Sequence, residues 1–191
     1  MSLAVSSRSI AVTLPDGAVR TFETPVTARD VAASLSKSLA KEAYVAEVDG
    51  ELVDLDQPLE RDVALRFIRG RDPEALEVIR HDAAHVMAEA VQDLFPGTQV
   101  TIGPPIDDGF YYDFARNEPF STDDLAKIEA RMSEIVAADK PFARKEVSRD
   151  EARALFEKMG ERYKLELLDA IPEDQPVSLY YQGDWVDLCR G

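Results

Sequence analysis

Residues 9–22 read Ser-Ile-Ala-Val-Thr-Leu-Pro-Asp-Gly-Ala-Val-Arg-Thr-Phe, and this stretch predicts a β-hairpin. Ile10, Val12 and Leu14 alternate with small or polar residues, which is typical of a strand that buries one face. The Pro-Asp-Gly sequence that follows is a turn signal, and residues 19–22 read as the returning strand. The hairpin therefore presents an apolar face that another element must cover.

The next residues supply that cover and complete a small sheet. Thr27 is a good helix N-cap residue, and apolar side chains recur at helical spacing over residues 28–35. Further strands are predicted at residues 44–48, around 52–53 and at 64–68. This order is typical of a β-grasp, ubiquitin-like fold, because one helix covers one face of a small mixed sheet. We assign this domain to residues 1–69.

A second domain is predicted over residues 70–191. The sequence Gly-Arg-Asp-Pro at residues 70–73 interrupts the strand pattern, and an amphipathic helix is expected at residues 74–95. Its predicted apolar stripe consists of Leu76, Ile79, Ala83, Val86, Ala90 and Leu94. The remaining elements are expected to be strands at 99–102, 109–114 and 162–167, helices at 125–139 and 149–159, and strand and turn over 177–189. Long helices packed on a mainly antiparallel sheet place the chain in the α+β class.

The composition favours a soluble, cytoplasmic protein. The formal net charge is −15, which argues against a protein whose main task is to hold a phosphate backbone. No apolar stretch reaches the roughly 18 residues that a membrane-spanning helix needs, so we expect no membrane association. Cys189 is the single cysteine and has no internal disulfide partner, which fits a reducing compartment.

The only two histidines of the chain, His81 and His85, are four residues apart and so share one face of the predicted helix. They fit a reactive site. They fit equally well a structural pair of helix histidines whose rings hydrogen-bond to carboxylates such as Asp82 or Glu89. Together with Cys189 they also supply three of the four ligands of a tetrahedral zinc site. The spacing alone leaves these alternatives open.

Other candidate residues are unremarkable when each is taken alone. Cys189 is by default a small buried residue, and Lys164 a surface lysine. Asp187 lies on the same side as Cys189 if that segment is a strand. Tyr112 is ordinary strand chemistry. The signal therefore comes from the order of several motifs and not from any single residue.

That order resembles the editing domain of threonyl-tRNA synthetases. The motifs that carry the resemblance are Ile79-Arg80-His81-Asp82-Ala83-Ala84-His85, then Ile102-Gly103-Pro104-Pro105-Ile106-Asp107-Asp108-Gly109-Phe110-Tyr111-Tyr112-Asp113, then Tyr163-Lys164, and finally Asp187-Leu188-Cys189-Arg190-Gly191. The preceding 65 or so residues resemble the TGS module of the same family. The family motif continues after Cys-Arg-Gly with Pro-His, whereas this chain stops at Gly191. We therefore interpret the chain as an amino-terminal fragment, cut within or at the edge of the editing domain.

The resemblance implies hydrolysis of seryl-tRNA(Thr), the mischarged product that a threonine enzyme makes. His81, His85 and Lys164 are the candidates for water positioning, ribose contact and proton delivery. Cys189 would position water or shape the pocket, and Asp187 would bind the seryl amino group.

Tyr112 would line the adenosine side of the site, and Gly103 would let the backbone approach the substrate closely. The tRNA(Thr) acceptor end is the implied partner. We expect no zinc and no other cofactor in this fragment. The full-length enzyme would use ATP, Mg and Zn in its missing catalytic domain, where it is also expected to dimerise, so the fragment should be a monomer.

The alternative is a non-catalytic, zinc- or partner-binding regulatory module. Any RNA contact must be local because the chain is acidic, and the predicted phosphate contacts are Arg66, Arg69, Arg71, Arg80, Arg144 and Lys145.

Overall fold

The computed structural model describes residues 8–106 and 108–189, which form two compact units dividing between Val78 and Ile79. The division falls inside a helix that begins at Ala75. Helices and mixed sheets occur together, which confirms the predicted α+β class.

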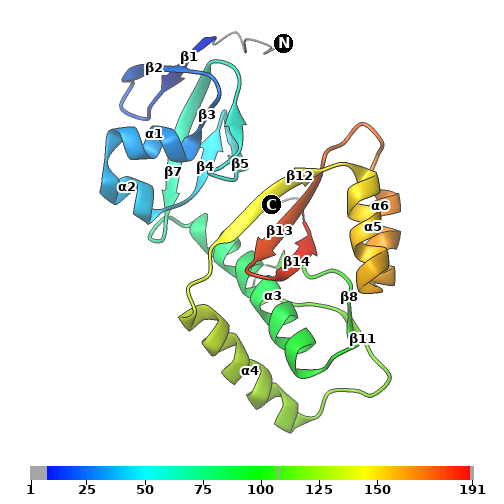
Figure 1. Cartoon of the computed structure of the whole chain (residues 1–191). Coiled ribbons are helices and arrows are strands. Elements are labelled where there is room, and N and C mark those ends of the chain that lie inside the picture. The colour runs from blue at the N-terminus through cyan, green and yellow to red at the C-terminus, as the bar shows by residue number, and fades with distance from the viewer. Residues whose placement is uncertain (1–7, 107, 190–191) are drawn as a thin grey trace. The chain divides into compact units, whose positions relative to one another are not determined.

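The first unit is built from short strands and two short helices (Figure 1). Its elements are β1 (Ser9–Thr13), β2 (Val19–Glu23), β3 (Val26–Thr27), α1 (Ala28–Leu35), α2 (Lys37–Glu42), β4 (Ala43–Val48), β5 (Glu51–Val53), β6 (Pro58–Leu59) and β7 (Val63–Arg69). The sheet order is β2-β1-β7-β4-β5, with β1 parallel to β7 and the other neighbours antiparallel. The predicted hairpin, helix and closing strand are present. The helix α2 and the β3–β6 pair were not predicted.

Local sequence explains how the first unit folds. Gly17 adopts a φ of +82° in the β1–β2 turn, a conformation that glycine reaches without steric cost. Thr27 caps α1 and forms a reciprocal capping box with Asp30. The covered face of the sheet and the helix share a core that contains Ile10 and Val31. The apolar residues of the alternating pattern therefore lie on the inner face of the sheet.

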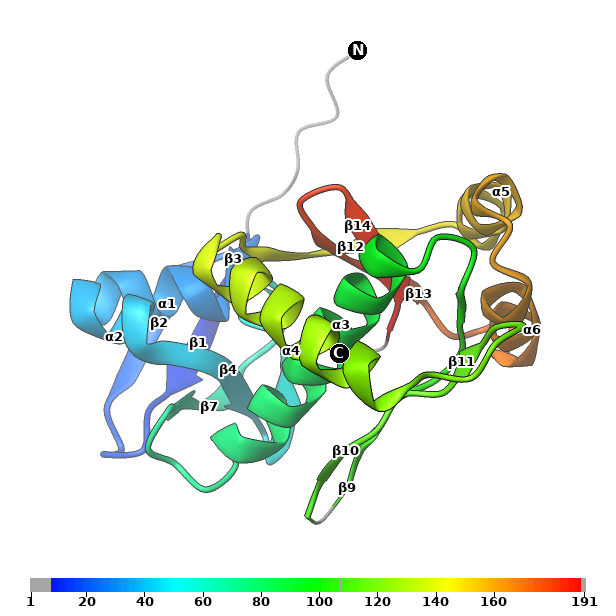
Figure 2. The ribbon, with the colours of Figure 1, turned by 90° about the horizontal axis from the view of Figure 1, so that it is seen from below.

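The second unit contains four helices and several short antiparallel pairs among its described residues. The elements are α3 (Ala75–Leu94), β8 (Gln99–Val100), β9 (Pro105–Ile106), β10 (Gly109–Phe110), β11 (Phe114–Ala115), α4 (Thr122–Ala137), β12 (Phe142–Val147), α5 (Arg149–Met159), α6 (Arg162–Ala170), β13 (Val177–Gln182) and β14 (Trp185–Leu188). The helix α3 starts within the first unit and continues into the second. Figure 2 shows the β9–β10 hairpin extending away from β8 and β11.

The described residues of this unit form three clusters of buried apolar side chains, one of which contains Ala84, Ala88, Val100 and Tyr112. The helices α3 and α4 meet around Val91, Ile128 and Ile135. The helices α5 and α6 lie next to one another and share a core with the antiparallel sheet β12-β13-β14 around Phe156 and Leu179 (Figure 1). The central strand of that sheet is therefore β13.

The predicted strand at residues 162–167 is wrong, because this segment is the helix α6. Its apolar residues alternate over a short stretch, which mimics a strand. The residues that the structure buries, Lys164 and Leu168, are four apart, which is helical spacing. The periodicity becomes helical only when residues beyond 167 are included.

Other expectations for the second unit need smaller corrections. The predicted strand at 109–114 is two separate two-residue strands, and the strand β12 was not predicted. On α3, Leu76, Ile79 and Leu94 are exposed, so only part of the predicted stripe, including Val86 and Ala90, lies on the buried face. The buried face includes small residues such as Ala84 and Ala88.

Candidate active site

The two histidines of α3 lie on one face of the helix, as their spacing predicts. Their ring centroids are 4.9 Å apart, and their Nε2 atoms are 3.1 Å apart. His85 is buried and His81 is partly exposed. The His81 Nε2 atom also lies 3.0 Å from the Cys189 Sγ atom. Residues 108 positions apart in sequence therefore meet at one point.

Asp187, on β14, is the most connected group of the site. Its Oδ2 atom accepts a hydrogen bond of 2.7 Å from the Tyr112 hydroxyl and lies 3.2 Å from His85 Nδ1. The latter is an ion-pair distance without hydrogen-bond alignment. The Oδ1 atom lies 2.5 Å from Lys164 Nζ and accepts a hydrogen bond from the Leu188 N–H. The carboxylate is only 1% exposed, so the protein supplies nearly all of its solvation.

Lys164 enters this cluster from α6 and is not the surface residue that a lysine is by default. Its side chain is 2% exposed. The ammonium group donates to the Thr101 carbonyl at 2.8 Å and to the Tyr112 hydroxyl at 2.9 Å, and it pairs with Asp187. An ammonium group has three N–H donors, so these contacts occupy all of them. Lys164 therefore holds the segments of Thr101, Tyr112 and Asp187 together.

Gly103 is required by close packing. A Cβ atom at this position would lie 2.4 Å from the Tyr112 ring and 2.5 Å from the Tyr111 carbonyl oxygen. Real Cβ atoms do not approach other atoms that closely, so any side chain would displace Tyr112.

The charges of the cluster alter its pKa values. Burial lowers the pKa of His85, but contacts with Asp187 and Cys189 outweigh burial and raise the pKa to about 9. Burial raises the pKa of Cys189, but His81 and His85 outweigh it and lower the pKa of the thiol to about 6. Burial and the Asp187 charge raise the pKa of Tyr112. At neutral pH the site therefore combines an imidazolium with a thiolate.

These groups surround one cavity of about 430 Å³. Every predicted site residue lines it, namely His81, His85, Gly103, Tyr112, Lys164, Asp187 and Cys189. The walls come from α3, the segment after β8, α6, and the end of β14. The cavity is mostly apolar apart from this cluster, which strengthens electrostatic interactions inside it. Arg190, Gly191 and Asp107 of the sequence motifs lie outside the described residues.

Sequence reasoning missed several neighbours of the cluster. Ser178 lines the same cavity, and its hydroxyl donates a hydrogen bond to the Cys189 carbonyl. The Thr101 carbonyl accepts a hydrogen bond from Lys164. The Trp185 ring lies edge-on to His85 with 5.7 Å between centroids, and its Nε1 donates to Gln92 at 2.8 Å. The aromatic and polar character of β13 and β14 was the only signal for these residues.

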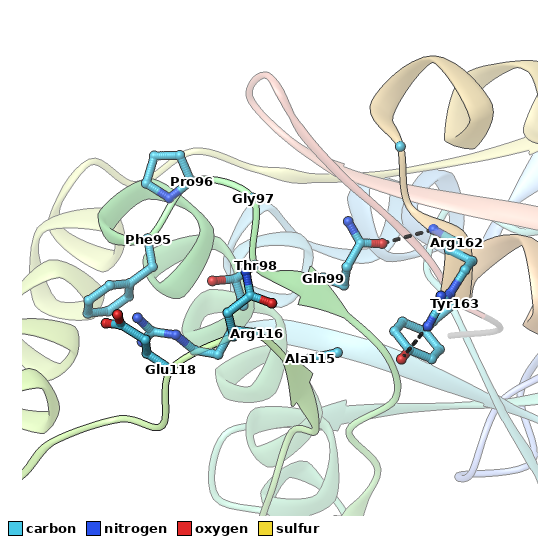
Figure 3. Close-up of a pocket in the computed structure, with 12 residues that line it drawn as sticks. Phe95, Pro96, Gly97, Thr98, Gln99, Ala115, Arg116, Glu118, Arg162 and Tyr163 are labelled. Carbon is cyan, nitrogen blue, oxygen red and sulfur yellow. Dashed lines mark hydrogen bonds between the residues drawn. The ribbon is translucent and has the colours of Figure 1, made fainter.

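A second, larger cavity of about 690 Å³ lies elsewhere in this unit (Figure 3). None of the predicted site residues lines it. The Arg116 guanidinium packs against both the Phe95 and the Phe120 ring, 4.4 Å and 4.6 Å from their centroids. The Arg162 backbone N–H donates to Gln99 Oε1 at 2.9 Å. Size alone therefore does not identify the reactive site, because titratable groups converge in the smaller cavity.

Several predicted phosphate contacts are engaged within the protein. Arg66 pairs with Glu47 and Glu74 at 2.6 Å each, and Arg144 pairs with Glu146 at 2.7 Å. The Arg80 guanidinium donates to the Ile106 carbonyl at 3.2 Å. A phosphate group would have to compete with these partners.

The same cluster has the donor atoms that a metal ion needs. The ligand atoms of His81, His85 and Cys189 all lie within 4.8 Å of one another. Zinc accepts imidazole nitrogen and thiolate sulfur ligands, so this set is chemically compatible with zinc.

Comparison with known proteins identifies the family of the first unit. Residues 10–68 match the TGS domain family, which agrees with the β-grasp fold of the first unit. In the part of the chain that the structure describes, no helix is long and apolar enough to span a membrane.

The whole-chain matches are more specific. The chain is 60% identical over 185 residues to a threonine–tRNA ligase of Sinorhizobium fredii, which covers 97% of this chain and 28% of that protein. The corresponding protein of Sinorhizobium medicae gives the same values, and that of Acidiphilium cryptum is 59% identical over 181 residues. By sequence, the chain corresponds to the amino-terminal region of threonine–tRNA ligases, as the motifs predict. It spans about 28% of the length of these relatives.

Proposed function

We propose that the second unit hydrolyses the ester bond of mischarged seryl-tRNA(Thr). The observation that carries this proposal is the convergence of two imidazoles, a thiol, a lysine and a carboxylate on one cavity. The similarity to threonine–tRNA ligases supports the choice of tRNA(Thr) and of serine as the amino acid to be removed. The esterified 3′ end of the tRNA would enter this cavity.

The chemistry requires water activation, a proton donor and stabilisation of negative charge. The water oxygen attacks the ester carbonyl carbon, the bond from that carbon to the ribose oxygen breaks, and the ribose oxygen takes up a proton. His81, with Cys189 beside it, positions the water and accepts its proton. His85 delivers the proton to the ribose oxygen through His81, because its raised pKa keeps it protonated at neutral pH and its Nε2 atom lies 3.1 Å from that of His81. Serine and tRNA bearing a free 3′ end are the products.

Lys164 and Asp187 set the electrostatics of this reaction. The Lys164 charge stabilises the oxyanion through the low-dielectric cavity, since its N–H donors are engaged by the protein. Asp187 orients His85 and attracts the seryl ammonium group. Tyr112 lines the adenosine side, and Gly103 lets the backbone approach the substrate.

A separate hydrolytic site solves an energetic problem of threonine selection. Serine lacks one methyl group of threonine, and losing one methyl in a pocket discriminates by only about 1–3 kcal/mol. A second site that excludes the larger threonyl group adds the missing selectivity.

Beyond this site, we propose the properties of the whole enzyme from its relatives. These are ligation of threonine to tRNA(Thr) with ATP, Mg and Zn outside this chain, dimerisation outside this chain, and a cytoplasmic location. The second unit itself is proposed to work without a metal.

The direct test is hydrolysis of seryl-tRNA(Thr) compared with threonyl-tRNA(Thr). Two versions are compared, the chain as it stands and one extended through the Pro-His that follows in the family motif. Selective release of serine by the extended version supports the proposal. If neither version releases serine although circular dichroism shows that both are folded, the proposal is contradicted.

Matched variants connect the activity to the cavity. Lys164→Met should abolish hydrolysis, whereas Lys127→Met should not, because Lys127 is exposed and pairs with Asp124 on α4. Equal activity of the two variants would show that the reaction occurs elsewhere.

A second candidate function, a zinc-binding module, is favoured by the close donor set of His81, His85 and Cys189. If so, the unmodified chain purified without chelators should contain one zinc ion per chain, and the His81→Ala variant should contain none. We expect no bound zinc in the unmodified chain.

A further inference from the structure

Cys189 lies just beyond the last residue of β14, where the regular strand has ended. The ladder between β13 and β14 pairs Leu179 with Leu188, and the next pair along the strands would be Ser178 and Cys189. At this position the Cys189 N–H donates to the Ser178 carbonyl at 3.3 Å. The Ser178 hydroxyl donates to the Cys189 carbonyl at 2.5 Å. Two hydrogen bonds thus hold the backbone of Cys189 on both sides of its Cα atom.

Ser178 is a firm anchor for this contact. It lies in β13, the central strand of the sheet, where it also pairs with Glu146 of β12. It is 6% exposed and lines the same cavity as the Cys189 thiol. An anchor in a central strand is more rigid than the strand end that it holds.

Without the serine hydroxyl, the Cys189 carbonyl would lose this partner and one of the two backbone bonds would disappear. The thiol contacts His81 over 3.0 Å, so a small rotation of the Cys189 backbone would break that contact. Misplacement of a reactive group by about 1 Å costs up to about 100-fold in rate.

We propose that Ser178 is a positioning residue that holds the Cys189 thiol against His81 by clamping the backbone of Cys189. The effect of this residue on the reaction rests on the proposed hydrolysis. The hydrogen-bonded clamp on Cys189 is a structural property, which can be measured without any substrate.

The experiment uses the extended chain of the previous section and three variants, Ser178→Ala, Ser178→Val and Ser178→Thr. Alanine and valine remove the hydroxyl, and valine keeps a side chain that suits a strand. Threonine keeps the hydroxyl and should retain the hydrogen bond to the Cys189 carbonyl. Ser133→Ala is the matched control, because the Ser133 hydroxyl also donates to a backbone carbonyl, that of Glu129, on the exposed side of α4.

Two readouts are measured. The first is the pH dependence of iodoacetamide alkylation, which reports on Cys189 alone because it is the only cysteine of the chain. Removal of the hydroxyl should move this midpoint to higher pH than in the extended chain that keeps Ser178, because the thiol loses its contact with His81. The second is hydrolysis of seryl-tRNA(Thr), for which kcat should fall about 10-fold while KM stays within about twofold.

The outcomes separate the clamp from the proposed function. A shifted alkylation midpoint in the alanine or valine variant, absent from the threonine and Ser133→Ala variants, supports the clamp even if no chain hydrolyses the ester. An unchanged midpoint in the folded alanine or valine variant overturns it, whatever happens to kcat. If kcat falls without a shift of the midpoint, Ser178 acts on the substrate and not on Cys189.

Discussion

One ion pair of the second unit is buried, whereas an ion-pair network of the first unit lies at the surface. In the first unit Arg66 reaches Glu47 and Glu74 with side chains that stay 29–37% exposed. In the second unit Lys164 and Asp187 pair at 2.5 Å with side chains that are 2% and 1% exposed. Water solvates the first set in the folded and unfolded states alike, so it adds little to stability. The second set loses its water on folding and survives only because Thr101 and Tyr112 supply further hydrogen bonds.

If the proposed function is right, this difference marks the charges that serve its chemistry. A buried pair is rarely better for stability than a well-packed apolar pair of similar volume. The second unit nevertheless keeps one at the wall of a cavity, next to an imidazole and a thiol. The buried pair is therefore best explained by the field that it creates in the site, and the following changes test that view.

Removing one member of the buried pair should have the largest effect. Asp187→Asn leaves the Lys164 ammonium buried without a counter-charge, so the second unit should lose about 3–5 kcal/mol of unfolding free energy. Urea unfolding followed by fluorescence measures this, because Trp185 is the only tryptophan and lies in the second unit. Seryl-tRNA(Thr) hydrolysis should also be lost.

Asp93→Asn is the control for that change. Asp93 pairs with Arg131 at 2.8 Å in the same unit, but its side chain is 43% exposed. Its loss should leave the unfolding midpoint almost unchanged. Similar midpoints for the Asp187→Asn and Asp93→Asn variants would contradict the view that burial distinguishes these pairs.

A smaller effect is expected for the coupling within the buried pair. Lys164→Met combined with Asp187→Asn removes both charges, so the double variant should be more stable than the sum of the single effects predicts by about 1–3 kcal/mol. The same urea unfolding, applied to both single variants and the double variant, gives this coupling energy. Strict additivity would mean that the two charges do not interact in the folded protein.

The sequence predicts much of the fold but less of this charge network. Alternation around Ile10 and the cap at Thr27 report local preferences, and the structure has the hairpin and helix that they predict. Lys164 was placed in a strand because a stretch of alternating residues cannot be told from part of a helix when the window is short. Its burial depends on contacts with Thr101 and Asp187, which are distant in sequence and leave no periodic signal.

The candidate site shows the same limit. The spacing of His81 and His85 predicts that they share a helical face, which the structure confirms. Their proximity to Cys189 followed only from the order of family motifs, because no local pattern connects residues so far apart. The sequence does not predict a role for Ser178, because a serine in a strand is ordinary. Its proposed role depends on one hydrogen bond to Cys189.

The pH dependence of stability should separate His85 from Cys189. The pKa of His85 is raised to about 9, so its contribution to stability is full below its ordinary value of 6.5 and is lost as pH rises through 9. The pKa of Cys189 is lowered to about 6, so its contribution is full above its ordinary value of 9 and is lost as pH falls through 6. In the unmodified chain the two oppose each other between pH 6.5 and 9.

Cys189→Ala removes one of these contributions and leaves His85 with Asp187. Removal of Cys189 also removes one of the causes that raise the pKa of His85, so the unfolding free energy of this variant should fall as pH rises above 6.5, over a range that ends below 9, by on the order of 1 kcal/mol. Urea unfolding at several pH values, followed through Trp185, measures the slope. A variant whose stability is flat or rises over this range would show that His85 is not held protonated by Asp187.

The smallest effect is expected in the first unit. Arg66→Gln removes a cation from between Glu47 and Glu74, but water solvates all three side chains, so the urea midpoint of this unit should barely move. Far-UV circular dichroism reports on the backbone of both units and Trp185 fluorescence on the second unit, so a change confined to the first unit alters the dichroism transition alone. Any difference from the unmodified chain should shrink further as salt is added, since exposed charges are screened. If Arg66→Gln shifted the midpoint as much as Asp187→Asn does, exposure would not separate the two kinds of ion pair, and the buried pair could no longer be assigned to the chemistry of the cavity on that ground.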